Sequence, residues 1–336
     1  MVGADVGTPV AVTRETEQGA AGSVAAGQVD GRLGERLGRL GKIAEMSERR
    51  GWAYLLLLPS LVLVATVVIY PVGSGLLLSF KRMMVNRPRL GTPWIGLDNY
   101  RALLEDEVFR IAAQNTVVWV VGGAVSQFLL GLVAALALNR SLPGFRPARV
   151  LILLPWLLPS VVAGHMWALL LDARLGVVND LLLKLKVLQS PLAWFADPIW
   201  AFPSVLLAEL WRWFPFFTLF LLAGLSAIPE ELYDAAALDG AGSWRRFLDI
   251  TLPLLRTVIV ASVVLRVIGL VNSPDLLVVL TNGGPGYKTQ ILSLYAFQTA
   301  YNSYNFGYAA AISVVMLLAL AVFTVLYVRL SRVTQE

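Results

Sequence analysis

Six long apolar segments constrain the fold of this chain more than any other feature of its sequence. They cover residues 52–80, 115–138, 148–171, 199–226, 252–280 and 306–330. Each is long enough to cross a hydrocarbon layer about 30 Å thick, which takes roughly 20 helical residues. Because backbone N–H and C=O groups find no water inside a bilayer, such segments must form helices. The sequence therefore predicts an all-α, polytopic membrane protein with six transmembrane helices.

The composition supports a membrane protein. Of the 336 residues, 57% are apolar and only 15% are charged, whereas average soluble proteins carry about 25% charged residues. Ten Trp residues suit anchoring at the membrane surfaces. We attribute the net charge of +5 to cytoplasmic loops and expect no nucleic-acid partner. Since the chain has no Cys and a single His, the sequence excludes disulfides, thiolate zinc sites and multi-histidine metal sites.

Prolines interrupt two of the apolar segments. Pro59 and Pro71 lie in the first, and Pro155 and Pro159 lie in the third. Because proline lacks a backbone donor, we expect kinks there, where neighbouring helices satisfy the freed carbonyls. His165, also in the third segment, is expected to hydrogen-bond between helices.

The distribution of Lys and Arg predicts that both termini lie in the cytoplasm. Basic residues gather in the N-terminal 50 residues, in the 139–149 loop and after the sixth segment. The 81–114 loop falls on the opposite side and is also basic, which weakens the asymmetry. The sequence predicts a cytoplasmic basic N-terminal tail at 1–50, partly disordered, a transmembrane domain at 51–330 and a cytoplasmic C-terminal tail at 331–336. Residues 31–50 fit either a solvated basic tail or a short helix on the inner leaflet.

The loop between the fourth and fifth segments, residues 229–251, has the pattern of two short helices. Pro229 followed by two glutamates is typical of a helix start. Asp239-Gly240 is expected to end this helix, and Ser243 to cap a second one. The alanines between them would let another protein surface approach the backbone closely. A plain linker is the alternative interpretation, but the pattern favours a coupling helix that docks in a partner's groove.

This loop resembles the cytoplasmic motif of the membrane subunits of binding-protein-dependent ABC importers. The family motif reads Glu-Ala-Ala, then three residues ending in Asp-Gly, then Ala, with Phe, Ile, Leu and Pro further on. The matching residues here are Asp234, Ala235, Ala236, Asp239, Gly240, Ala241, Phe247, Ile250, Leu252 and Pro253. The departure is Asp234 in place of glutamate, which keeps the charge on a shorter side chain.

Other stretches are similar to the carbohydrate branch of the same family. They are GLDNYRALLEDEVF at 96–109, NT at 115–116, LTNGGPGYKT at 280–289 and FGYAAAISV at 306–314. A second departure lies at residues 272–275, Asn-Ser-Pro-Asp, where relatives more often have an aromatic residue before the aspartate. The resemblance covers roughly residues 50–330.

The resemblance implies the type I ABC importer permease fold and a transport role, with no enzymatic activity in this chain. The chain would form half of the translocation pathway for a sugar or oligosaccharide in the inner (plasma) membrane of a prokaryote. Its implied partners are a second homologous permease subunit, an ATPase subunit dimer, an extracytoplasmic substrate-binding protein and the lipid bilayer. The alternatives are an importer of glycerol-3-phosphate or related polyol phosphodiesters and an ion-coupled secondary transporter.

The sequence contains no nucleotide-binding P-loop, which requires Gly, four residues and then Gly-Lys-Ser/Thr. Its nearest Gly-Lys pair, Gly41-Lys42, is followed by Ile43. We therefore expect no cofactor and no metal in this chain, with ATP and Mg bound by partner subunits.

Two sets of candidate site residues follow. The ATPase-coupling set is Glu231, Asp234, Ala235, Ala236, Asp239, Gly240, Ala241 and Phe247. The substrate-pathway set consists of polar or aromatic residues at membrane depth: Glu209, Trp211, Arg212, Arg266, Asn272 and Asp275. For Glu209 and Arg212, three apart on one helical face, a mutual ion pair is the simpler interpretation. For the Trp residues it is interfacial anchoring or packing.

Overall fold

The computed structural model describes residues 50–139 and 145–333 of the chain. The predictions for the N-terminal tail, for the helix over 31–50 and for the last three residues lie outside this range. The described residues form helices and loops without a β-strand, and two isolated bridges join Lys81 to Trp94 and Met84 to Asn305. They divide between Gly73 and Ser74 into two units, and each is described by itself.

The first unit contains one apolar helix. It is built from α2 (Arg50–Val64), a π-helical turn (Ala65–Ile69) and the start of α3 (Tyr70–Leu78). Residues 56–78 qualify as one membrane span, so neither Pro59 nor Pro71 breaks the helix. The π-turn directly before Pro71 is the local irregularity with which the helix accommodates the missing donor.

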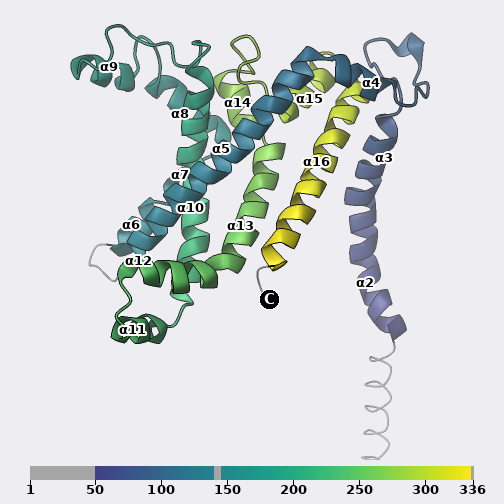
Figure 1. The fold of residues 1–336 in the computed structure, drawn as a ribbon. Helices are drawn as coiled ribbons and strands as arrows, with labels where there is room; N and C mark the ends of the chain where they lie inside the picture. The colour runs from purple at the N-terminus through teal and green to yellow at the C-terminus, as the bar shows by residue number, and fades with distance from the viewer. Residues whose placement is uncertain (1–49, 140–144, 334–336) are drawn as a thin grey trace, which may run out of the picture. The chain divides into compact units, whose positions relative to one another are not determined.

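The second unit holds the remaining helices (Figure 1). They are α4 (Asp98–Glu105), α5 (Glu107–Leu138), α6 (Phe145–Leu151), α7 (Leu154–Leu157), α8 (Ser160–Leu170), α9 (Val177–Lys184), α10 (Ala201–Ser226), α11 (Glu230–Leu238), α12 (Ser243–Arg246), α13 (Leu252–Asn272), α14 (Asp275–Leu280), α15 (Leu292–Tyr301) and α16 (Phe306–Val333), with a 3-10 turn at Pro88–Leu90. Helices α4, α9 and α15 lie at one end of this unit, and α11, α12 and the end of α16 lie at the other.

Among the described residues, five helices are long and apolar enough to cross a membrane, and a sixth span is obtained if one bent pair counts as a single span. The bent pair is Arg149–Leu157 with Ser160–Leu170, which meet at 98°. The break falls at Leu158 and Pro159, so the expected kink in the third segment is confirmed. The predicted positions of the spans agree with the structure to within a few residues, except at two of their starts.

Two spans begin earlier than the sequence predicts. Helix α5 starts at Glu107 rather than 115, because Asp106 Oδ1 accepts hydrogen bonds from the amides of Val108 and Phe109 at 2.8 and 3.2 Å. The fifth span starts at Ser243, because α12 continues through a π-helical turn (Phe247–Thr251) into α13. Ser243 is the first helical residue and makes no side-chain cap, so the expected cap is wrong.

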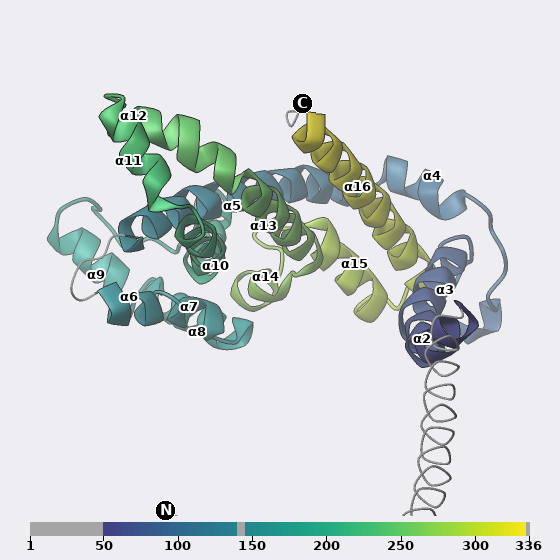
Figure 2. The same ribbon diagram turned by 90° about the horizontal axis from the view of Figure 1, so that it is seen from below.

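Close packing of α5 against α10 forms the centre of the second unit. A Cβ on Gly131 of α5 would lie 2.5 Å from Cβ of Phe217 on α10, so only glycine permits this approach. Helix α13 lies between α10 and α16 when the bundle is viewed from below (Figure 2). Buried apolar side chains such as Trp119, Phe217 and Leu270 fill the spaces between these helices.

We predict that Gly131→Ala destabilises the protein by about 1–3 kcal/mol, because the added methyl group overpacks the contact between α5 and α10. The measurement is the melting temperature of the purified protein by fluorescence-detected size-exclusion chromatography. Gly122→Ala on the same helix is the control, since its Cβ would meet only Leu206 at an ordinary 3.4 Å. Equal melting temperatures for the two variants would contradict the prediction.

Candidate functional site

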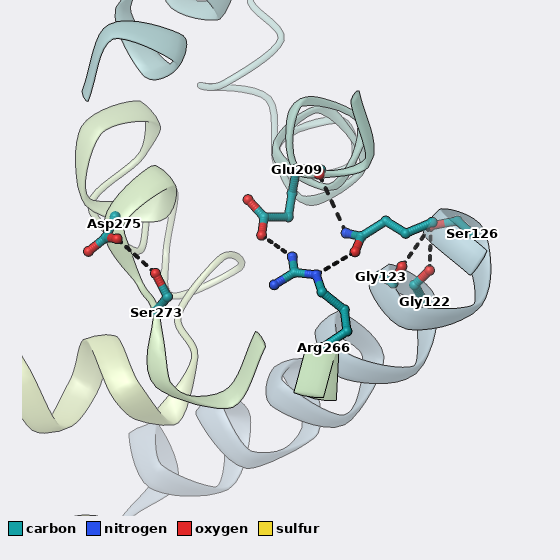
Figure 3. Close-up of polar contacts among 8 residues, drawn as sticks. Gly122, Gly123, Ser126, Glu209, Arg266, Ser273 and Asp275 are labelled. Carbon is teal, nitrogen blue, oxygen red and sulfur yellow. Dashed lines mark hydrogen bonds and ion pairs between the residues drawn. The ribbon is translucent and has the colours of Figure 1, made fainter. Parts of the chain in front are cut away.

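A buried polar network joins α5, α10 and α13 (Figure 3). Arg266 of α13 donates from Nε to Gln127 Oε1 of α5 at 2.6 Å and from Nη2 to Glu209 Oε1 of α10. The Gln127 amide also donates to the backbone oxygen of Glu209 at 3.4 Å. All three side chains are buried. The network therefore ties three apolar spans together through polar groups that satisfy one another.

An aromatic ring completes the surroundings of Arg266. Its guanidinium carbon lies 4.1 Å from the ring centroid of Trp213, close enough for a cation–π contact. A charge at membrane depth is costly unless it is paired or lies in a water-filled cavity. Arg266 has a carboxylate, an amide oxygen and a ring face as partners, which explains how it is tolerated inside the bundle.

The expected ion pair between Glu209 and Arg212 is not formed, because the Glu209 carboxylate binds Arg266 instead. The guanidinium carbon of Arg212 lies 5.3 Å from the Trp213 ring centroid. Its Nε is buried, and its side chain makes no hydrogen bond or ion pair with the residues that the structure describes. Arg212 is thus a cation near the middle of the span α10 that lacks a carboxylate partner within this part of the chain.

The other pathway candidates lie outside the network. Trp211 meets the ring of Trp167 edge-on at 5.9 Å, and Asn272 donates to the backbone oxygen of Ile268 at 2.9 Å. Asp275 accepts a hydrogen bond from Ser273 at 2.7 Å, and Figure 3 shows this pair apart from Glu209 and Arg266. The structure therefore groups Glu209, Arg266 and, through Trp213, Arg212, but not the remaining three.

Two details correct the sequence analysis of these spans. Gln127 is absent from the candidates that the sequence predicts, although an amide within the apolar run of α5 is a signal that the sequence contains. His165 is exposed in this chain and has no hydrogen bond to a described residue, so the expected bond between helices is not formed.

The loop that carries the Asp234–Ala241 motif forms a helix with a defined stop. Helix α11 ends in the expected place, and Gly240 takes the left-handed conformation with φ of +78°. The amides of Gly240 and Ala241 donate to the oxygens of Ala237 and Ala236 at 3.1 and 2.9 Å, which is the Schellman pattern. The second helix is not separate as expected, because α12 is the start of the α13 span.

A hydrogen bond holds this loop against the start of the α13 span. The Tyr233 hydroxyl lies 3.0 Å from Thr251 Oγ1, which links α11 to the π-helical turn before α13. Two large apolar residues that the sequence analysis did not single out are strongly exposed, Leu238 at 91% and Trp244 at 72%. The Trp244 ring stacks on Phe247 with centroids 5.7 Å apart. The loop is therefore an ordered platform with an apolar surface and acidic residues around it.

The chain is similar to membrane subunits of known transport systems. The model of the family described as "Binding-protein-dependent transport system inner membrane component" matches residues 127–335. The chain is 37% identical over 283 residues to the trehalose/maltose transport system permease protein MalF of Thermococcus litoralis, covering 84% of this chain and 94% of the relative. It is 36% identical over 280 residues to the sulfoquinovosyl glycerol transport system permease protein SmoG of Agrobacterium fabrum, covering 83% and 90%.

A solved structure has the same fold. The chain superimposes with a TM-score of 0.75 on a chain of a bacterial ABC transporter involved in the import of the acidic polysaccharide alginate. The sequence identity is 22%, and the match covers 88% of this chain and all of the other.

We predict that Glu209→Leu and Arg266→Leu each destabilise the protein by about 3–5 kcal/mol, because each leaves a buried charge without its partner. The double variant should be more stable than either single variant, since it removes both charges. The three melting temperatures, measured against the wild type, form a double-mutant cycle. Additive losses in the double variant would show that the two charges do not interact.

Proposed function

Because the chain belongs to the family of binding-protein-dependent transport system inner membrane components, we propose that it forms half of the translocation pathway of an ATP-driven ABC importer for a sugar or oligosaccharide. Family membership carries the transport role. The named substrates of the similar permeases, trehalose, maltose and sulfoquinovosyl glycerol, support the carbohydrate class. They favour this function over an ion-coupled secondary transporter.

The α11–α12 platform is the proposed docking site for an ATPase subunit dimer. Its residues are Glu231, Asp234, Ala235, Ala236, Asp239, Gly240, Ala241 and Phe247, to which the structure adds Leu238 and Trp244. Large exposed apolar side chains on an ordered helix suit insertion into a partner's groove. Because α12 is continuous with α13, a displacement of the platform would be transmitted along one helix towards Arg266 and its network.

The polar groups around Trp213 are the proposed substrate contacts. Arg212 offers donors that no described residue accepts, and hydroxyl-rich sugars supply acceptors. Trp211, Asn272 and Asp275 are proposed to line the same pathway at other positions. The free guanidinium of Arg212 also fits a phosphate group, so glycerol-3-phosphate or a related polyol phosphodiester is the second candidate substrate.

The remaining subunits and the orientation follow from this role. A second homologous permease would complete the pathway, and an extracytoplasmic substrate-binding protein would deliver the sugar. The platform and the end of α16 lie at the same end of the second unit (Figure 1), which supports a cytoplasmic C-terminus in a prokaryotic inner membrane. The ATPase dimer would bind ATP and Mg, with both termini of this chain on its side.

We expect uptake of labelled disaccharide by proteoliposomes that contain the whole importer with its ATPase facing the interior. This uptake should require both ATP and the binding protein. Ionophores that collapse ion gradients should leave uptake unchanged. Glycerol-3-phosphate in excess serves as the competitor that tests the second candidate. Uptake driven by an ion gradient without ATP would refute the proposed function.

We predict that Leu238→Asp lowers the amount of ATPase subunit that co-purifies with this chain at least tenfold, as expected for a charge placed in the apolar centre of an interface. Deletion of residues 230–250 should have the same effect. Leu175→Asp is the matched control, because Leu175 is also strongly exposed but lies near α9, at the other end of the unit. Co-purification at the wild-type level in both experiments would exclude docking through the platform.

A further inference from the structure

The loop between α8 and α10, residues 171–200, contains the short helix α9 at the end of the second unit opposite the platform. Both ribbon views place α9 at the edge of this unit, and Figure 1 shows it crosswise to α10. The chain turns back directly after α8, because Asp172 Oδ1 accepts hydrogen bonds from the amides of Arg174 and Leu175, each at 2.8 Å. Since only residues 171–176 separate the two helices, α9 begins close to the level at which the α8 span ends.

A buried amide fixes the orientation of α9 within this loop. Asn179 is 3% exposed. Its side-chain amide donates to the backbone oxygens of Asp172 and Leu192 at 3.1 and 2.9 Å. Its Oδ1 accepts from the Leu192 amide at 3.2 Å and from Trp194 Nε1 at 3.1 Å. The helix therefore cannot rotate about its axis without breaking four hydrogen bonds of a buried group.

The face of α9 that points away from Asn179 carries an apolar edge, formed by Val177, Leu181 and Leu185. These residues follow one another at intervals of four, so they lie on one side of the helix, and each is more than half exposed. The charged pair Asp180–Lys184, at 2.6 Å, lies on the neighbouring edge. An exposed apolar edge beside a charged edge is typical of a helix that lies in the interface of a bilayer.

The apolar edge continues the surface that the neighbouring spans turn to lipid. Leu169, at the end of α8, and Ile199, directly before α10, are also strongly exposed. Trp194 and Trp200 meet edge-on at 5.7 Å beside the start of α10, and Trp side chains favour the boundary between lipid and water. Lys184 and the nearby Lys186 are exposed, and lysines at this depth extend towards lipid phosphates.

We propose that α9 inserts its apolar edge into the lipid interface beside the spans. The bilayer is the occupant that these observations favour, because it covers the edge at all times. A water-soluble partner would leave three large apolar side chains in water whenever it dissociates. The anchor holds the end of α8 and the start of α10 at a fixed depth. The inference does not depend on the proposed transport role.

The test measures the surroundings of single nitroxide labels on α9. Because the sequence has no Cys, one substitution creates one labelling site in this chain. Leu181→Cys lies on the apolar edge, and Asp180→Cys on the charged edge is the matched control. Both are labelled in the importer, assembled with cysteine-free partner subunits in lipid nanodiscs. Power-saturation EPR then compares collisions with oxygen, which dissolves in lipid, and with a water-soluble nickel complex.

The ratio of oxygen to nickel collisions should be at least about threefold higher at residue 181 than at residue 180, as expected for an apolar edge that enters the acyl boundary. Leu185→Cys should give the same result and replaces Leu181→Cys if that variant does not assemble. Equal ratios at the two edges would place α9 in water and overturn the proposal. Protection of residue 181 from both reagents would also overturn it, because a protein subunit would then cover the edge.

Discussion

The pairing of Arg266 with Glu209 and Gln127 is the interaction on which the arrangement of the spans depends. Apolar helices in a bilayer gain little from hiding apolar surface, because the lipid is as apolar as they are. Specific contacts must therefore decide which helix faces which. Here Arg266 on α13 binds the carboxylate of Glu209 on α10 and the amide of Gln127 on α5. The close approach at Gly131 holds α5 against α10.

The second unit has two ends that differ from its apolar middle. Within the spans, the buried polar groups Arg266, Glu209 and Gln127 bind one another, whereas the irregular segments lie at the ends. At one end Gly240 stops α11 and leaves Leu238 and Trp244 exposed. At the other end Asp106 begins α5 and draws two tyrosines towards it. Helix α13 and its extension α12 connect the first end with the central network through one continuous span.

Much of the fold followed from hydropathy alone, because each apolar segment must satisfy its own backbone bonds wherever it lies. The break at Pro159 is also predictable from the sequence, because proline disrupts the hydrogen bonds of its own helix. One wrong expectation concerns a partner that is distant in sequence. Glu209 was expected to pair with Arg212, its neighbour on the helix, but Arg266 lies closer in space. The start of the fifth span at Ser243 was missed because a π-helical turn carries the helix through residues that resemble a loop.

By itself the sequence determined the approximate positions of the apolar spans, the stop at Gly240 and the family to which the motif at 234–241 points. These properties depend on local hydrogen bonds, on the length of apolar segments and on backbone conformation. Only the tertiary structure decided which charges are paired and which arginine is left with unused donors. Those outcomes depend on side chains from separate helices meeting at distances of a few ångströms, which the order of residues along the chain does not encode directly.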